Sequence, residues 1–256
     1  MMKMFAAFAA LALALPAPAG AAEQARPPAT TQAKAKPKPR VFPKPRAKAE
    51  PAKAEDEPVK TEAEAAAEAE RMAAVARVAD WIAASGDNGS LPYAIVDKKA
   101  AALLLFNAKG KRVAKVPVLI GVAVGDDATP GVGSKNLAEI GPAEKTTPAG
   151  RFLARYGLAG GRQRVLWVDY ATSVALHPIP PTASKKERRR QRMLSPTPED
   201  NRITFGCINV PVAFYGKDLQ PLFRRKGGYV YVLPDTKPIE EVFPRLRVQA
   251  VAGARG

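Results

Sequence analysis

The sequence is poor in the side chains that form disulfides and bind metals, because it has one cysteine and one histidine in 256 residues. A single cysteine excludes a disulfide within the chain. A zinc site would have to rest mostly on carboxylates, whereas zinc is usually bound by cysteine and histidine. The chain also lacks a long glycine-rich phosphate loop and internal repeats of solenoid length. We therefore expect neither a metal centre nor a repeat architecture.

Long apolar runs are also scarce, and the one near the N-terminus is short. Lys3 is followed by an apolar run at residues 5–15 and by the small residues Ala19 and Ala21. A membrane span needs about 20 apolar residues, so this pattern indicates a secretory signal peptide over residues 1–22. A buried N-terminal helix is the alternative. In an exported chain, a lone cysteine is either an idle buried residue or a reactive thiol.

Positive charge is abundant, with 40 Lys and Arg against 24 Asp and Glu, a net charge of +16. This excess attracts anionic partners, and export favours a cell-envelope polymer over nucleic acid. Residues 23–60 consist mainly of Ala, Pro, Lys, Arg and Glu, which predicts a disordered linker. The linker is either a plain solvated spacer or a segment that rests on anionic polymers.

The remaining sequence predicts a mainly β domain with one or two helices, preceded by a helix. Residues 61–86 have an apolar stripe at helical spacing, with Thr61 as a plausible N-cap. A domain over residues 91–235 then alternates short β-rich runs with turn residues. We expect strands at 93–97, 102–107, 113–124, 150–156, 165–170, 174–176 and 228–233, and a helix at 211–225. Residues 236–256 are expected to form a C-terminal tail.

Cys207 and His177 are the candidate catalytic residues. Gly206 before the cysteine allows a tight turn, and a helix starting near Pro211 would favour the thiolate form. His177 follows a β run and supplies the only imidazole that could accept the thiol proton. The competing interpretation is a small buried cysteine and a structural histidine.

Three blocks in this region resemble the signature of the L,D-transpeptidases, the YkuD-like family of peptidoglycan cross-linking enzymes. They are Tyr93 to Asp97 with the strand ending at Gly121, Thr147-Pro148-Ala149-Gly150, and Leu176-His177-Pro178 followed by Thr204-Phe205-Gly206-Cys207-Ile208-Asn209. The resemblance covers residues 91–234 and keeps the order of the blocks in the family. It implies the mixed, β-sandwich-like catalytic fold of that family.

The resemblance implies that Cys207 is the nucleophile and His177 the base, oriented by the backbone carbonyl of Pro178. Backbone N–H groups at Gly206 and Cys207 would form the oxyanion hole. The expected substrate-binding residues are Arg202, Thr204, Phe205 and Asn209. Phe205 stands where the family usually has histidine, and this departure bears on how the donor is bound.

The implied activity is a periplasmic cysteine acyltransferase that needs no metal or organic cofactor. It would form a thioester with the third residue of a peptidoglycan stem peptide, release D-alanine and pass the acyl group to an amine. The acceptor could be a neighbouring stem, an envelope lipoprotein or a free D-amino acid. The resemblance also implies inhibition by carbapenems. The rivals are a peptidoglycan or lipoprotein-linkage hydrolase on the same fold and a catalytically silent envelope-binding module.

A basic insertion at residues 182–200 separates the two candidate residues by a longer gap than the family usually has. It contains Lys185-Lys186-Glu187-Arg188-Arg189-Arg190-Gln191-Arg192. Guanidinium groups suit bidentate binding of carboxylates, so this segment could be a lid that holds stem-peptide carboxylates. A solvated, flexible loop is the alternative.

Overall fold

The computed structural model describes residues 61–247 of the chain. The expected signal peptide (1–22), the expected linker (23–60) and residues 248–256 of the expected tail lie outside these residues. The first element of these residues is α1 (Glu62–Ser85), close to the expected bounds. Ten strands follow: β1 (Tyr93–Asp97), β2 (Ala102–Phe106), β3 (Arg112–Pro117), β4 (Ile120–Gly121), β5 (Gly150–Ala159), β6 (Gln163–Asp169), β7 (Val174–Pro178), β8 (Arg202–Thr204), β9 (Ile208–Val210) and β10 (Gly228–Val232).

Eight of these strands form one mixed sheet, in the order β3-β2-β1-β10-β5-β6-β7-β9, and β4 pairs with β8 in a separate ladder. Within the large sheet, β1 pairs with β10 and β7 pairs with β9 in parallel, and the other neighbours are antiparallel. Strand β5 serves two partners: Gly150 to Ala154 pair with β10, and Arg155 to Ala159 pair with β6. The prediction of a mainly β fold with few helices is confirmed.

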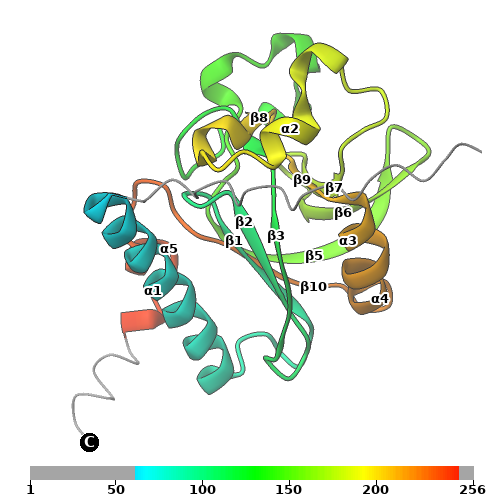
Figure 1. Cartoon of the computed structure of the whole chain (residues 1–256). Helices are drawn as coiled ribbons and strands as arrows, with labels where there is room; N and C mark the ends of the chain where they lie inside the picture. Colours follow the sequence, from blue (N-terminus) through cyan, green and yellow to red (C-terminus); the bar gives the residue numbers. More distant parts are fainter. Residues whose placement is uncertain (1–60, 248–256) are drawn as a thin grey trace, which may run out of the picture. The chain divides into compact units, whose positions relative to one another are not determined.

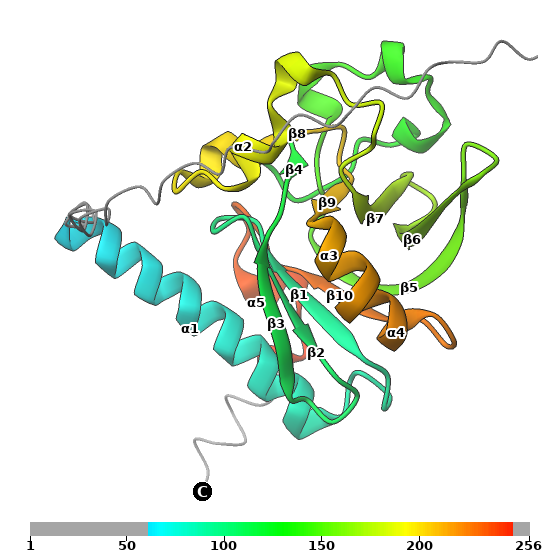
Figure 2. The same cartoon turned by 45° about the vertical axis from the view of Figure 1, so that its right-hand side comes forward.

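The sheet is covered on both faces near β1, β2 and β10, which explains why β1 and β2 are nearly continuous apolar runs. Successive side chains of a strand point to opposite faces. Tyr93 and Ile95 pack in a cluster with Trp81 of α1, whereas Ala94 and Val96 join the main core. Figures 1 and 2 show α1 beside β1 to β3 on one side and α3 with α4 on the other.

The helix expected at residues 211–225 is present, with an irregular centre. It consists of α3 (Val212–Phe214), a π-helical turn (Tyr215–Leu219) and α4 (Gln220–Phe223). Pro221 lies in the first turn of α4 and has no N–H for the helical ladder, which accounts for a change of hydrogen-bond pattern just before it. Phe214, Leu219 and Phe223 are buried in the main core.

Three local expectations differ from the structure. The strand expected at 113–124 is divided into β3 and β4, and β3 ends at Pro117, which cannot donate to a ladder. The segment 202–210 holds two strands, β8 and β9, that the sequence did not predict. The expected tail begins with packed structure, because α5 (Ile239–Val242) is followed by Phe243 and Leu246, both buried against the α1 cluster.

A buried ion cluster joins the end of β1 to the loops above the sheet. The ammonium of Lys98, whose side chain is fully buried, lies 2.9 Å from Asp126 and 3.3 Å from Asp235. It also donates hydrogen bonds to the carbonyls of Gly125 and Thr147. Asp235 is in turn paired with the guanidinium of Arg202 at 2.7 Å. Two cations and two carboxylates therefore balance one another in the interior.

Candidate active site

The parallel pairing of β7 with β9 brings the sequence around the only histidine next to the sequence around the only cysteine. His177 is in register with Asn209, and Leu176 with Ile208. Leu176 and Ile208 are fully buried in the core, so His177 and Asn209 point to the opposite face of the strand pair. Cys207 directly precedes β9.

His177 is held by its neighbour in the chain. Its Nδ1 lies 2.7 Å from the carbonyl oxygen of Pro178, the contact that the family resemblance implies. A carbonyl only accepts hydrogen bonds, so Nδ1 carries the proton and the lone pair is on Nε2. Burial lowers the pKa of His177, the bond to Pro178 raises it, and the nearby Arg189 lowers it, with a net shift downward. At neutral pH the imidazole is therefore an uncharged base with Nε2 as the basic atom.

The thiol of Cys207 is protonated in this environment. Burial raises the pKa of Cys207, although the backbone N–H of Ala175 and the charge of Arg189 oppose the rise. Sγ contacts the carbonyl oxygen of Ser173 at 3.7 Å, and no hydrogen bond joins the thiol to the imidazole of His177. Desolvation dominates, so the net shift of the Cys207 pKa is upward, away from the thiolate that the helix start near Pro211 was expected to favour.

The loop that carries Cys207 is fixed by hydroxyl groups. The Oγ1 of Thr204 donates to the carbonyl of Cys207 at 2.6 Å and accepts from the N–H of Gly206 at 3.2 Å. The hydroxyl of Thr147 donates to the carbonyl of Gly206 at 2.8 Å. Gly206 has φ of 120°, and an added Cβ would lie 2.6 Å from the carbonyl oxygen of Thr146. Only glycine fits this turn.

These bonds locate several residues that the sequence predicted to contact substrate. Thr204 is 2% exposed, and its hydroxyl is used within the loop, as is the N–H of Gly206. The guanidinium of Arg202 is engaged by Asp235 at 2.7 Å and lies 3.4 Å from the carbonyl of Ala123. In this structure Thr204, Gly206 and Arg202 use these polar groups in hydrogen bonds within the protein.

Phe205 lies at the surface beside the cysteine. Its side chain is partly exposed, and the Nζ of Lys145 lies 3.9 Å from the centre of its ring. This cation–π contact holds an ammonium group against the face of the Phe205 ring. The Lys145 contact could not be predicted from the sequence, because the two residues are sixty positions apart.

The basic insertion contains short helical turns. The segment has 3₁₀ turns at Lys185–Glu187 and Pro198–Asn201, with α2 (Arg189–Met193) between them. Arg189 reaches back to β9 and donates to the Oδ1 of Asn209 at 2.9 Å. Arg188 and Arg190 are exposed. Sequence reasoning named the arginines together and missed that one of them supports the site.

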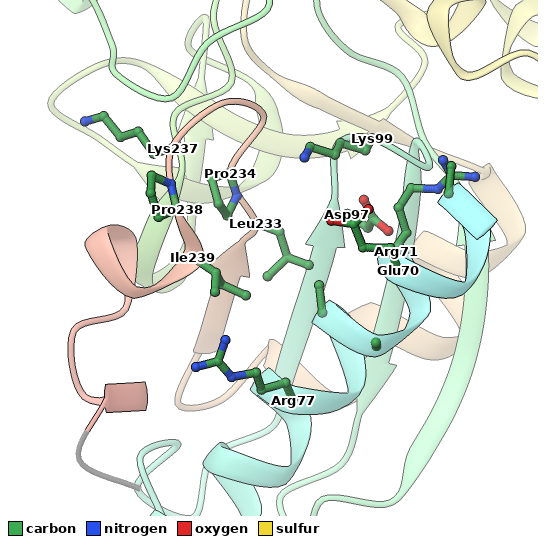
Figure 3. Close-up of a pocket in the computed structure, with 13 residues that line it drawn as sticks. Glu70, Arg71, Arg77, Asp97, Lys99, Leu233, Pro234, Lys237, Pro238 and Ile239 are labelled. Atoms are coloured by element: carbon green, nitrogen blue, oxygen red, sulfur yellow. The ribbon is translucent and has the colours of Figure 1, made fainter. Parts of the chain in front are cut away.

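A cavity of about 560 Å³ lies elsewhere, between α1, the start of the β1–β2 turn and the segment that follows β10 (Figure 3). Two of its basic residues are already paired, Arg77 with Glu240 and Lys237 with Asp127. None of its lining residues belongs to β7, β9 or the cysteine loop. In residues 61–247, no cluster of three metal-binding side chains occurs, and no helix has the length and apolar character needed to cross a membrane.

Comparisons with known proteins find only distant likenesses. No protein-family model and no curated protein matches the chain. The helical cell-shape-determining protein Pgp2 of Campylobacter jejuni is 15% identical, with a TM-score of 0.39 over 61% of this chain and 52% of that one. An L,D-transpeptidase of Enterococcus faecium is 17% identical, with a TM-score of 0.29 over 56% of this chain and 49% of that one.

A further solved structure is an L,D-transpeptidase of Xylanimonas cellulosilytica, 14% identical, with a TM-score of 0.31 over 56% of this chain and 60% of that one. The chain thus spans about half the length of the first two structures that it matches. At such identities and TM-scores, similarity to these structures does not indicate which reaction this chain catalyses.

Proposed function

We propose that this protein is a peptidoglycan L,D-transpeptidase in which Cys207 forms a thioester with the third residue of a stem peptide. The observation that carries the proposal is the geometry of His177. Its Nδ1–H is fixed on the Pro178 carbonyl at 2.7 Å, and Nε2 is left as the base on a strand paired with the one that follows the cysteine. The sequence blocks that resemble the family assign the same roles to the same residues.

In the first half-reaction, the thiol proton moves from Sγ of Cys207 to Nε2 of His177 as Sγ attacks the carbonyl carbon of the third stem residue. The tetrahedral intermediate then collapses. Its C–N bond breaks, and the leaving D-alanine nitrogen takes the proton from Nε2. Because thiol and imidazole are both neutral at rest, proton transfer accompanies the attack, and a thiolate does not have to be stored beforehand.

In the second half-reaction, an amine of a neighbouring stem attacks the thioester and gives its proton to Nε2, and Sγ leaves with that proton. Backbone N–H groups of the cysteine loop stabilise the oxyanion in both steps. For the N–H of Gly206 to take part, its 3.2 Å bond to the hydroxyl of Thr204 must open. That hydroxyl has a shorter bond to Cys207, which remains available to hold the loop.

The location and partners follow from the proposed reaction. A protein that acts on stem peptides works in the periplasm or cell envelope, which fits the signal peptide expected at residues 1–22. Peptidoglycan is the donor, with a stem amine, an envelope lipoprotein or a D-amino acid as the acceptor. Carbapenems should acylate Cys207, the only thiol of the chain.

The test is incubation of the purified protein with disaccharide tetrapeptide, followed by mass spectrometry. We expect cross-linked dimers, free D-alanine and, at short times, an acyl adduct on Cys207. Cys207→Ala should abolish all three products, and full activity of that variant would refute the proposal. Release of D-alanine without dimers would favour the hydrolase, and a wild type that forms no product would favour the silent binding module.

A further inference from the structure

Arg189 is the one arginine of the basic insertion that is hydrogen-bonded to a residue beside the base. Its side chain is 12% exposed, although the residue belongs to a segment rich in surface charge. Nη1 donates to the Oδ1 of Asn209 at 2.9 Å, while Nε and Nη2 bind the carboxylate of Glu187 at 2.8 and 3.3 Å. Its neighbours Arg188 and Arg190 face solvent. The sequence run therefore contains two kinds of arginine: Arg189 and Arg192 are partly buried and donate hydrogen bonds to β9 and β8, whereas Arg188 and Arg190 are exposed.

The contact determines which way the Asn209 amide points. A guanidinium group can only donate hydrogen bonds, so the amide oxygen must face Arg189 and the NH₂ group must face the other side. On that side Nδ2 lies 3.5 Å from Nε2 of His177. Asn209 is fully buried, so water does not compete for its amide. Each group in this chain of contacts therefore donates to the next: Arg189 to Asn209, Asn209 to His177, and His177 to the carbonyl of Pro178.

We propose that Arg189 is a positioning residue, which orients the Asn209 amide so that His177 stays neutral with its lone pair on Nε2. An NH₂ group opposite Nε2 tolerates a lone pair and opposes a proton on that nitrogen. If the amide turned over, its oxygen would face Nε2 and stabilise an N–H there. The Nε2–H tautomer and the imidazolium ion would both gain, and neither can accept the thiol proton at Nε2.

The surrounding charges act in the same direction. The groups near His177 are the Cys207 thiol next to β9, the Asn209 amide on β9, and the guanidinium of Arg189, which Glu187 pairs. Burial lowers the pKa of His177, and the positive charge of Arg189 lowers it further against the opposing bond to Pro178. Removal of Arg189 takes away both the charge and the constraint on the amide. The pKa of His177 should then rise.

His177 is the only histidine of the chain, so its imidazole can be observed without assignment. The experiment is a pH titration of the untagged, ¹⁵N-histidine-labelled full chain by NMR. For the wild type we expect the Nδ1–H tautomer and a pKa below the ordinary value of 6.5. For Arg189→Met we expect a higher pKa and signals of the Nε2–H tautomer. Arg190→Met is the matched control, because it removes the same charge from an exposed position of the same helix.

Equal shifts in the Arg189→Met and Arg190→Met proteins would overturn the proposal, since net charge alone would then explain them. A wild type that carries its proton on Nε2 would also overturn it. Asn209→Ala provides a second test that does not depend on α2 folding correctly. It should raise the pKa of His177, and Arg189→Met added to it should shift that pKa less than it does in the wild type. Fully additive shifts would contradict a relay through the amide.

The role of Arg189 rests on the proposed function in one respect, namely that His177 acts as the base of a transpeptidase. The two can fail separately, because the titration needs no substrate. Correct tautomer and pKa responses in a protein that forms no dimers would remove the proposed function and keep the relay. Cross-linking activity, together with an Arg189→Met titration identical to that of the wild type, would remove the relay and keep the proposed function. In an active protein, the acid limb of kcat/KM should move to higher pH in Arg189→Met and stay in place in Arg190→Met.

Discussion

Replacement of Lys98 by methionine should destabilise the protein far more than the same change at the next residue. The Lys98 ammonium is fully buried and faces the carboxylates of Asp126 and Asp235 at 2.9 and 3.3 Å. Methionine fills a similar volume but leaves both carboxylates in the interior without this cation. Lys99, in contrast, is exposed, so Lys99→Met removes an identical charge from solvent.

The magnitude follows from what remains after the change. Breaking a buried ion pair by removing one partner costs about 3–5 kcal/mol. Asp126 keeps hydrogen bonds from three backbone N–H groups and from the hydroxyl of Thr236, and Asp235 keeps Arg202. The carboxylates are thus partly compensated, which favours the lower end of the range. Two carbonyls lose a donor as well, at about 1 kcal/mol each. We expect a total loss of about 3–5 kcal/mol.

The assay is urea unfolding at pH 7, followed by circular dichroism, for the wild type and both variants. Lys99→Met should stay within about 0.5 kcal/mol of the wild type, as surface substitutions usually do. If Lys98→Met lost no more than Lys99→Met, the cluster would not contribute to stability, and the physical account of it would be wrong.

Three further outcomes are expected. Gly206→Ala should lower the rate of D-alanine release by about 100-fold or more, because its Cβ would meet the carbonyl of Thr146 at 2.6 Å and displace the nucleophile; near-normal rates would show that the loop adapts. Burial favours a raised pKa for Asp126, but its hydrogen bonds outweigh burial and hold that pKa well below the usual range. The resulting stability is fully present above about pH 5 and is lost as pH falls further, so urea midpoints should decline below about pH 5 and decline less in Asp126→Asn. A double-mutant cycle of Phe205→Ala and Lys145→Met should give a coupling of about 0.5–1 kcal/mol in urea unfolding, since the ammonium lies over the ring; zero coupling would exclude a stabilising contact.

Much of the fold could be predicted from the sequence because strand and helix periods are local properties. The run at β1 was located to the residue, and α1 nearly so, since Trp81 and Ile82 mark its apolar face. Strand β9 was not found, because three residues are too short for a period to show. The packed segment after β10 was missed for a different reason. Phe243 and Leu246 belong with Ile239 and Val242 to a short apolar pattern at helical spacing, which Pro244 interrupts, and their burial depends on α1, far away in the sequence.

The parts of the candidate site that consist of rare residue types could be predicted from the sequence. The parts that depend on side-chain contacts between distant positions could not. Cys207 and His177 stand out by being single, and the neighbouring motif gave them roles. The bond between Arg189 and Asn209 joins positions twenty residues apart and leaves no spacing signal. Arg202 looked free because it is close to the cysteine, yet Asp235 engages it across the fold. The sequence alone does not reveal whether a charged side chain is engaged by an oppositely charged one in the folded protein.

The position of β10 between β1 and β5 has a consequence for how the chain reaches its final state. In the large sheet, β1 to β3 form one block and β5, β6, β7 and β9 form another, and β10 connects the edges of the two blocks. Because β10 is the last strand of the described residues 61–247, both edges stay unpaired until residue 232 has been made. Unpaired edges invite pairing with other chains. A chain of this kind therefore exposes two sheet edges until β10 has paired with both of them.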